Sequence, residues 1–419
     1  MGTLWKIALR NVLRHKRRTI ITAIVMTVGI GLFIMMDSML VGMDRMTIDN
    51  MVDYTESSIK VRTPEYVSNL QGTPLDHGVP AAEIALRKIM AADSHVTAVA
   101  PRMNFVASVS NYEDSIPVIA TAVDPARDGA VFKLPESLVK GIWLNKAPAG
   151  SIVIGAGLAE ELKVSVGDYL LLSASTAYDN VNANEYPIAG ILSTPMPNIN
   201  DAGVFMAFAD ADELLGTSGF VSEIVVATHR AASMQTMLAE SKALATKIQA
   251  ILPGLKVDSI SDLADDYLAM RAMKSKFSYV MILVVLLIAG VGIVNTILMS
   301  VYARIREIGV LRAYGMSPPE IRRLFTIEGI IIGFVGSVGG VLFGMALVWY
   351  LIATGIPMGS LIGKVDMGGL PLTGTMYGEW NPATMAFGFI FGLVVAFIAA
   401  RIPAKRAAKL EVTDALRFV

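Results

Sequence analysis

Four long hydrophobic stretches dominate the pattern of apolar and polar positions. They are free of charged residues over 19–36, 277–303, 329–363 and 380–400. A helix that crosses a bilayer needs roughly 20 predominantly apolar residues. The first stretch reaches that length if its helix continues through Asp37 to Gly42. We therefore predict four transmembrane helices, which cover residues 19–42, 277–303, 324–353 and 383–401.

Basic residues gather in three segments beside these spans. Residues 1–18 hold six lysines and arginines and no acidic residue, and residues 304–323 and 401–419 hold five each. Residues 354–382 hold only Lys364. Because short loops rich in lysine and arginine stay in the cytoplasm, we expect both chain ends and the loop 304–323 to be cytoplasmic. The loop 354–382 is then periplasmic, and residues 402–419 form a cytoplasmic tail.

The first 18 residues carry a helical pattern of their own. Four basic residues recur at spacings of four and three, which places them on one helical face: Lys6, Arg10, Arg14 and Arg17. This pattern predicts a cytoplasmic interfacial helix over residues 1–18 that lies along the membrane surface. The alternative is that these residues form only a positively charged segment beside the first span, without a helix of their own.

Residues 43–276 show the mixed periodicity of an α/β domain. Strand-like runs cover 58–61, 96–101, 115–123, 152–154, 169–173, 186–192 and 222–227, and helical runs cover 81–91, 158–162, 210–215 and 231–251. The order of these runs predicts one α/β subdomain, split between residues 43–125 and 218–260. A β-rich subdomain of residues 126–217 is inserted into it, and residues 261–276 form a helix that leads into the second span.

Composition narrows the chemistry that this chain can perform. It contains no cysteine and only four scattered histidines, so disulfides and thiolate metal sites are excluded and a histidine metal site is not favoured. Hydrophobic residues make up 54% and charged residues 17% of the chain, whereas soluble domains average about 25% charged. The composition therefore supports a membrane protein without a bound metal.

Two glycine motifs resemble nucleotide-binding sequences only in part. Residues 152–159 fit a strand, G-x-G-x-x-A and a helix, but the helix is short and no crossover follows it. A tight turn that packs a short helix on a strand is the favoured interpretation. Residues 359–365 lack the Ser or Thr that follows the lysine of a phosphate loop. We expect no cofactor in this chain, so another chain must supply any ATP site.

The segment after the second span has the most informative local pattern. Residues 304–314 predict a short helix that ends at Gly315, and Ser317-Pro-Pro-Glu320 predicts a capping box for the next helix. Apolar residues recur at a spacing of three along the first helix: Ile308, Leu311 and Tyr314. Such a helix-turn-helix can dock on a soluble partner or lie on lipid headgroups, and the residues alone favour neither.

Small residues and acids within the spans carry further expectations. The third span repeats G-x-x-x-G through Gly329, Gly333, Gly336, Gly340 and Gly344. This spacing lets helices approach closely, and we expect it to pack helices within one chain rather than form a dimer face. Asp37 and Glu328 lie near the ends of spans, and Glu328 is expected to pair with a nearby arginine.

Five methionines gather near the outer end of the first span: Met35, Met36, Met39, Met43 and Met46. Flexible thioethers suit a surface that accepts varied apolar partners. These residues are therefore a candidate apolar cargo surface for a lipid or an acylated ligand. Ordinary packing against lipid or the core is the alternative.

Several segments resemble the MacB/FtsX-type ABC transporter permeases. The resemblance rests on residues 8–19, on Arg306-Glu-Ile-Gly-Val-Leu-Arg-Ala-Tyr-Gly-Met-Ser317 followed by residues 325–329, and on residues 403–417. Residues 153–159 with 166–168 resemble a recurrent element of the family's periplasmic domains. The similarity covers essentially the whole chain in order. In its length and its lack of a fused ATPase, the chain resembles in particular the lipoprotein-releasing LolC/LolE permeases.

The resemblance implies an architecture and partners. Residues 43–125 and 218–260 would be Porter-like and residues 126–217 Sabre-like. Residues 304–317, named the coupling segment below, would contact a separate cytoplasmic ABC ATPase that binds ATP and magnesium. The implied contact residues are Arg306, Glu307, Ile308, Leu311, Arg312, Ala313, Tyr314, Gly315, Met316 and Ser317. A second permease chain, identical or different, would complete the assembly in the bacterial inner membrane.

The resemblance also implies that this chain is not itself catalytic and that its partners include no nucleic acid. ATP hydrolysis by the partner would drive periplasmic movement that extracts lipoproteins from the inner membrane, with a periplasmic carrier as a further partner. MacB-like export of a peptide, drug or lipid and FtsX-like regulation of a cell-wall hydrolase are the alternatives. We expect Leu311→Asp to abolish ATPase association while membrane insertion stays intact.

Overall fold

The computed structural model describes residues 2–14, 16–69, 75–178, 180–217, 219–231, 233–357 and 375–409. The chain divides into two compact units. The first unit contains residues 1–44, 270–357 and 375–419, and the second contains residues 45–269. The phosphate-loop-like residues 359–365, most of the loop 354–382 and the tail from residue 410 lie outside the described residues.

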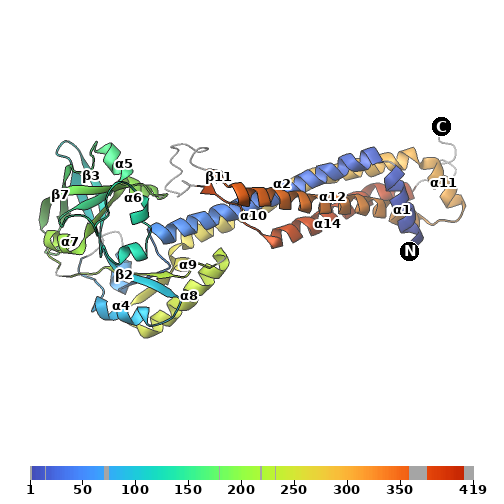
Figure 1. The fold of residues 1–419 in the computed structure, drawn as a ribbon. Helices are drawn as coiled ribbons and strands as arrows, with labels where there is room; N and C mark the ends of the chain where they lie inside the picture. The colour runs from blue at the N-terminus through green and yellow to red at the C-terminus, as the bar shows by residue number, and fades with distance from the viewer. Residues whose placement is uncertain are drawn as a thin grey trace. The chain divides into compact units, whose positions relative to one another are not determined.

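Helices build the first unit (Figure 1). They are α1 Gly2–Arg14, α2 Lys16–Tyr54, α10 Asp265–Ala303, α11 Ile305–Ala313, α12 Pro318–Thr354 and α14 Pro382–Ala408, with short strands β11 Ile356–Pro357 and β12 Thr375–Met376. Within the described residues, α2, α10, α12 and α14 are the four helices long and apolar enough to cross a membrane. The predicted membrane fold with four spans is confirmed.

Each span is part of a helix that is longer than its hydrophobic run. The helix α2 continues twelve residues past Gly42 to Tyr54, and α10 joins most of the predicted 261–276 helix to the second span without a break. The helix α12 begins at Pro318 rather than 324, and α14 continues past 401 to Ala408. Charged residues end an apolar stretch but still favour a helical backbone. Hydrophobicity therefore predicts where the spans lie, but it does not predict where their helices begin and end.

The glycines of α12 lie where helices approach one another within the first unit. An added Cβ at Gly329 or Gly333 would lie 2.2 Å from the Cβ of an alanine on α14. An added Cβ at Gly336, Gly340 or Gly344 would lie 2.6–2.8 Å from the Cβ of a residue on α2. Glycine therefore allows α12 to pack against two neighbours, because any side chain would force these helices apart.

The second unit is a mixed α/β structure, as predicted. Its strands are β1 Ile59–Arg62, β2 Val96–Ser110, β3 Ser115–Val123, β4 Leu138–Gly141, β5 Ile152–Gly155, β6 Tyr169–Ser175, β7 Val181–Leu192, β8 Gly203–Ala207, β9 Glu223–Thr228 and β10 Lys256–Ser259. Its helices are α3 Pro64–Ser68, α4 Ala82–Met90, η2 Asp128–Ala130, η3 Pro135–Ser137, α5 Ala156–Glu161, α6 Pro197–Ala202, α7 Phe208–Leu215, α8 Met234–Ile251 and α9 Ile260–Leu263.

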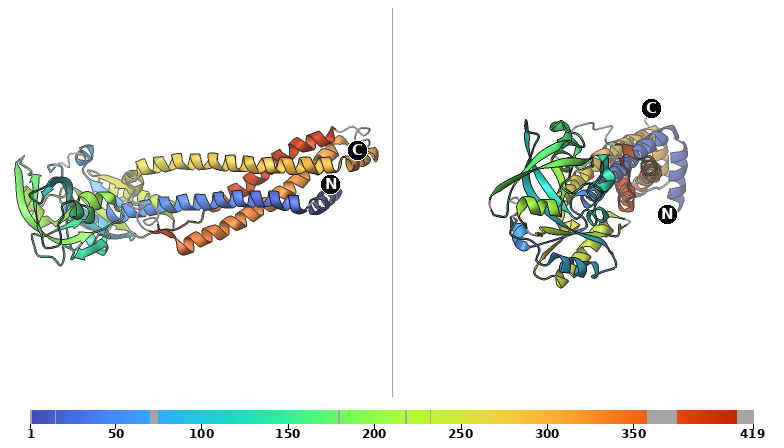
Figure 2. Two further views of the ribbon diagram at one scale, coloured as in Figure 1. Left: turned by 90° about the horizontal axis from the view of Figure 1, so that it is seen from above. Right: turned by 60° about the vertical axis from the view of Figure 1, so that its left-hand side comes forward.

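One sheet runs through this unit (Figure 2). Among the described residues its ten strands follow the order β10-β1-β9-β2-β3-β8-β5-β7-β4, with β6 paired to β2 and β7. The long strand β2 joins two hydrophobic cores. Its first half pairs with β9, and its second half pairs with β6. One core packs α4 and α8 against β1 and β9, and another contains β3 together with β5 to β8.

The position of β3 differs from the predicted subdomain boundary. The sequence assigns residues 115–123 to the split α/β subdomain, whereas Val118, Ala120 and Ala122 lie in the core of the β-rich part. The strand β3 pairs along its whole length with β2 and in parallel with β8. The long strand β2 belongs to both subdomains, and β3 forms a hairpin with its second half. The packing of β3 therefore follows from this hairpin and not from its place in the sequence.

The glycines of residues 152–159 pack a short helix against its neighbour. An added Cβ at Gly155 would lie 2.2 Å from the carbonyl oxygens of Ile199 and Asn200, and one at Gly157 would lie 2.2 Å from a carboxylate oxygen of Asp201. The helix α6 therefore covers the turn at which a dinucleotide would need access to backbone amides. This close packing is the geometry of the predicted tight turn.

Candidate functional site

A short helix and a capped turn form the coupling segment in the first unit. The helix α11 ends at Ala313, and Gly315 has a φ of +94°, a conformation that side chains rarely adopt. The hydroxyl of Ser317 and the carboxylate of Glu320 then form the predicted capping box, with Pro318 in the first turn of α12. The chain therefore folds the coupling segment by local rules, and the predicted helix-turn-helix is present.

A buried ion pair fixes the start of α11 to the helices beside it. Arg304 donates from Nη1 to Oε1 of Glu328 at 3.2 Å and from Nε to Oε2 of Glu307 at 2.6 Å. Asn11 of α1 donates to the same Glu328 oxygen at 2.6 Å. The predicted pairing of Glu328 with an arginine is therefore present. This network connects α1, α11 and α12 at one end of the helices.

The apolar stripe predicted on α11 does not form a free surface. Ile308 is buried in the core of the first unit, and Leu311 packs against that core while partly buried. Tyr314 is 88% exposed, and Val310, which the stripe omits, is 44% exposed. Ile308 and Leu311 face inward, because a short amphipathic helix first covers the core of its own chain.

The other predicted contact residues divide between the surface and the core. The exposed residues of the coupling segment are Arg306, Glu307, Ala313, Gly315 and Ser317, and Arg312 and Met316 are half-buried. Arg306, Val310, Ala313 and Tyr314 lie at helical spacing on the outward side of α11. We call these four residues the outward face.

The five candidate cargo methionines are half-buried on α2. Met35, Met39 and Met43 follow one another at a spacing of four, and Met36 and Met46 flank this row. Met46 belongs to the second unit and the other four to the first. Their side chains are neither enclosed in the core nor fully exposed, so the structure leaves both the cargo surface and ordinary packing open.

The last turns of α2, from residue 45 on, belong to the second unit and pack within it through apolar contacts and ion pairs. Ile48 and Val52 are buried in a cluster with residues of α8 and α9. Arg230, which follows β9, binds the carboxylates of Asp49 and Asp53, and Lys133 lies 3.0 Å from Asp53. We call Asp49, Asp53, Lys133 and Arg230 the α2 clamp.

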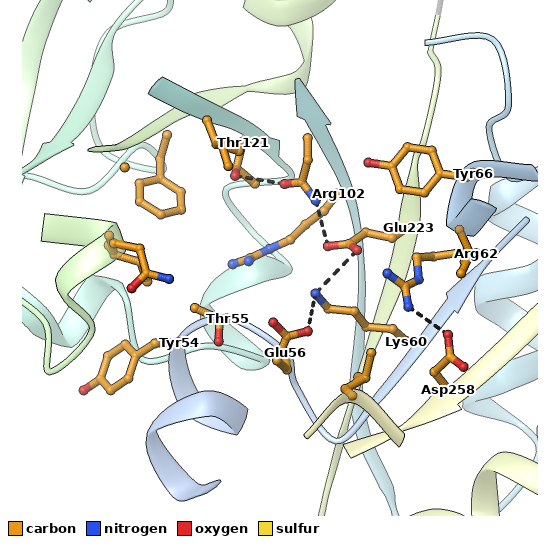
Figure 3. A pocket seen from close by; sticks show the side chains of 18 of the residues that line it. Tyr54, Thr55, Glu56, Lys60, Arg62, Tyr66, Arg102, Thr121, Glu223 and Asp258 are labelled. Carbon is orange, nitrogen blue, oxygen red and sulfur yellow. Dashed lines mark hydrogen bonds and ion pairs between the residues drawn. The ribbon is translucent and has the colours of Figure 1, made fainter. Parts of the chain in front are cut away.

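Beside the end of α2, a cavity of about 620 Å³ contains buried charges (Figure 3). Lys60 of β1 lies 2.8 Å from Glu56 and 3.6 Å from Glu223 of β9. Arg62 binds Asp258 of β10 at 2.8 Å. The cations and anions thus occur as pairs that link the turn after α2 with β1, β9 and β10, a set of contacts that holds the strands in register.

Two side chains in this cavity have altered acidity. Burial by itself would raise the pKa of Glu223, but the cations of Lys60, Arg62 and Arg102 outweigh burial and hold this pKa below its ordinary value. Burial, and then the negative charge of Glu223, raises the pKa of Tyr66 to about 12. Glu223 is therefore ionised and Tyr66 neutral at physiological pH.

We expect the sheet around β1 and β9 to lose stability in acid. Because the pKa of folded Glu223 is lowered, its contribution is present above the unfolded pKa near 4.5 and is lost as pH falls through the folded pKa. Hydrogen exchange of β1 and β9 amides in the whole chain should rise below about pH 5. The variant Glu223→Gln should show a weaker pH dependence over that range. An equal slope in both proteins would contradict this assignment, since Asp93 and Asp262, whose pKa values are also lowered, are present in both.

Sequence reasoning did not identify the outward Val310, the α2 clamp or the paired charges of the cavity. One signal was present, because Lys60 and Arg62 alternate with Ile59 and Val61 in a strand whose four residues are all buried. Buried charges need partners. The partners Glu223 and Asp258 lie more than 160 residues away, however, and no local pattern connects them.

Two family models match the chain. The MacB-like periplasmic core domain matches residues 19–244, which is more than half of the chain, and the FtsX-like permease C-terminal region matches residues 279–412. The first match includes α2 and most of the second unit, and the second includes α11, α12 and α14.

Known proteins resemble the chain over most of its length. An uncharacterized ABC transporter permease of Methanocaldococcus jannaschii is 25% identical over 66% of this chain, which spans 65% of that relative. The lipoprotein-releasing system transmembrane protein LolC of Xylella fastidiosa is 24% identical over 83% of each chain. The solved periplasmic region of MacB from Actinobacillus actinomycetemcomitans is 11% identical, with a TM-score of 0.34, over 53% of this chain and 97% of its own.

Proposed function

Because this chain belongs to the ABC transporter permeases with a MacB-like periplasmic core domain and an FtsX-like C-terminal region, we propose that it converts ATP hydrolysis by a separate ATPase into movement of its second unit. The coupling segment receives the ATPase through the outward face of α11. The ATPase holds ATP and magnesium, and this chain contributes no catalytic group. Two permease chains form the assembly, with both ends of each chain in the cytoplasm.

The continuity of α2 supports this proposal most directly. This helix runs from Lys16 to Tyr54 without a break, so one continuous helix includes a candidate membrane span and the two aspartates of the α2 clamp. A helix of 39 residues transmits axial displacement because its backbone hydrogen bonds resist stretching. The network of Arg304, Glu328 and Asn11 joins α11 to α12 and α1. Displacement of α11 then moves α12, whose glycines pack against α2.

We propose lipoproteins of the inner membrane as the cargo. The alignment with LolC over 83% of both chains supports this assignment. The half-buried methionines of α2 supply a flexible apolar surface for acyl chains. MacB-like export is the competing function, because this chain itself matches the MacB-like periplasmic core model.

A release assay tests the proposal. The permease and its ATPase are reconstituted in vesicles with an acylated protein or with the same protein lacking acyl chains. We expect ATP-dependent transfer of the acylated protein to a soluble carrier and no stimulation by the unacylated form. Export of unacylated peptide or drug without release of acylated protein would favour the MacB-like function instead. Activity that persists without any ATPase would contradict membership of an ATP-driven complex.

The α2 clamp provides a variant that separates hydrolysis from release. Arg230→Ala removes the cation bound to Asp49 and Asp53. We expect this variant to hydrolyse ATP but to release less cargo per ATP. Lys247→Ala, which removes an exposed pair with Asp93 elsewhere in the unit, is the matched control. Equal release by both variants would argue against transmission through α2.

A further inference from the structure

A groove of about 330 Å³ in the first unit combines arginines with apolar side chains. The helix α12 contributes Arg322, Arg323, Ile327 and Ile330. Thr326 of α12 also lines it, as do Phe397 and Arg401 of α14 and Leu4 and Trp5 of α1. The helix α1, dark blue in Figure 2, lies beside α12. Neither the coupling segment nor the α2 clamp includes any of these residues.

The charges and apolar side chains are ordered along both helices. On α12 the arginines lie near its start, and Ile327 and Ile330 follow one and two turns deeper in the candidate span. On α14, which ends at Ala408, Phe397 lies one turn deeper than Arg401. On each helix, therefore, an arginine lies about one turn, or 6 Å, closer to the helix end than an apolar side chain of the groove.

The arginines are available to an anion. In the described part of the chain, no carboxylate lies within ion-pair distance of Arg322, Arg323 or Arg401. Glu320, three residues before Arg323, already accepts hydrogen bonds from the backbone and hydroxyl of Ser317. Arg401 lies over the ring of Phe397, with its guanidinium carbon 5.8 Å from the ring centre. Three guanidinium groups that line one groove favour a phosphate, which arginine binds through parallel hydrogen bonds.

We propose that this groove binds an anionic phospholipid of the leaflet nearest α1. The phosphate lies against Arg322, Arg323 and Arg401, and an acyl chain follows Ile327, Ile330 and Phe397 toward the bilayer centre. Trp5, which is 50% exposed, lies at headgroup level, where tryptophan is enriched in membrane proteins. Basic pockets between membrane helices bind anionic headgroups in this way. The bound lipid joins α1 to α12 and α14 and is independent of the ATPase and of the cargo.

Lipid binding can be measured on the purified, delipidated full chain in detergent without ATP. We expect dioctanoyl phosphatidylglycerol to bind and to raise the temperature of unfolding, whereas dioctanoyl phosphatidylcholine should do neither. Each single variant, Arg322→Gln, Arg323→Gln or Arg401→Gln, should bind phosphatidylglycerol about fivefold more weakly, and the triple variant on the order of 100-fold more weakly. If the folded single variants bind as the wild type does, the proposal is wrong.

Two controls distinguish binding in the groove from nonspecific attraction of lipid. The triple variant Arg17→Gln/Lys405→Gln/Arg406→Gln removes three exposed charges near the same end of the helices but none from the groove, and it should bind like the wild type. Equal loss in both triple variants would indicate nonspecific charge attraction. Glycerophosphoglycerol and inorganic phosphate, which lack acyl chains, should bind far more weakly than the lipid. Equal affinity for them, or dimerisation that protects the groove without lipid, would overturn the proposal.

Discussion

Replacing Tyr314 with alanine is expected to weaken association with the ATPase by about 30-fold or more, because an exposed aromatic anchor at a protein interface contributes roughly 2 kcal/mol. Tyr314 is 88% exposed at the end of α11, and Val310 lies one turn before it on the same face. The double variant Val310→Asp/Tyr314→Ala should abolish association, since it also places a charge in the contact. Co-purification and binding kinetics with the ATPase measure both effects.

Two controls separate loss of the contact from loss of the fold. Tyr350→Ala removes another exposed tyrosine, close to the C-terminal end of α12, and should leave association unchanged. Leu311→Asp, the variant that the sequence alone suggests, should instead lower the thermal stability of the first unit, because Leu311 packs inward. Normal association of a folded Val310→Asp/Tyr314→Ala variant would remove the outward face from the proposed contact.

Replacing Asp128 with alanine is expected to destabilise the second unit by about 3–5 kcal/mol, because it leaves a buried guanidinium without its counterion. Asp128 is fully buried and accepts two hydrogen bonds from Arg102, at 2.7 Å from Nε and 3.0 Å from Nη2. The guanidinium also lies 3.5 Å from the ring centre of Phe132. Hydrogen exchange of β2 and β3 in the whole chain measures the loss.

The neighbouring residue supplies the control for this variant. Arg127 pairs with Glu83 at 2.8 Å, but both side chains are largely exposed. Arg127→Ala should therefore change stability by less than about 1 kcal/mol. A similar small effect of Asp128→Ala would mean that water or another residue compensates Arg102, contrary to the buried geometry.

Local sequence patterns predicted the first unit well, because membrane spans and helix caps depend on neighbouring residues. The four spans, the turn at Gly315 and the capping box of Ser317 and Glu320 all follow from such patterns. Local patterns did not predict which side of α11 faces the core. Its stripe of Ile308 and Leu311 shows that one face is apolar, but whether that face meets the chain itself or a partner depends on tertiary packing.

The second unit was predicted less completely, for a different reason. Most strands were found, yet β4 and β8 were missed. The five apolar residues of β8, between two short helices, fit a helix or a strand equally well. The charge pairs of the cavity join residues far apart in the chain, such as Lys60 with Glu223 and Arg62 with Asp258. Long-range pairing leaves no periodic signal in one sequence.

The strand β2 also determines how the second unit can unfold. Its 15 residues pair with β9 at one end and β6 at the other, and they are paired with β3 along most of their length. Melting either core would remove hydrogen bonds that the other core needs. The two parts are therefore one cooperative folding unit, despite their separate hydrophobic interiors. A force applied at one edge of the sheet is therefore opposed by the packing of both cores together.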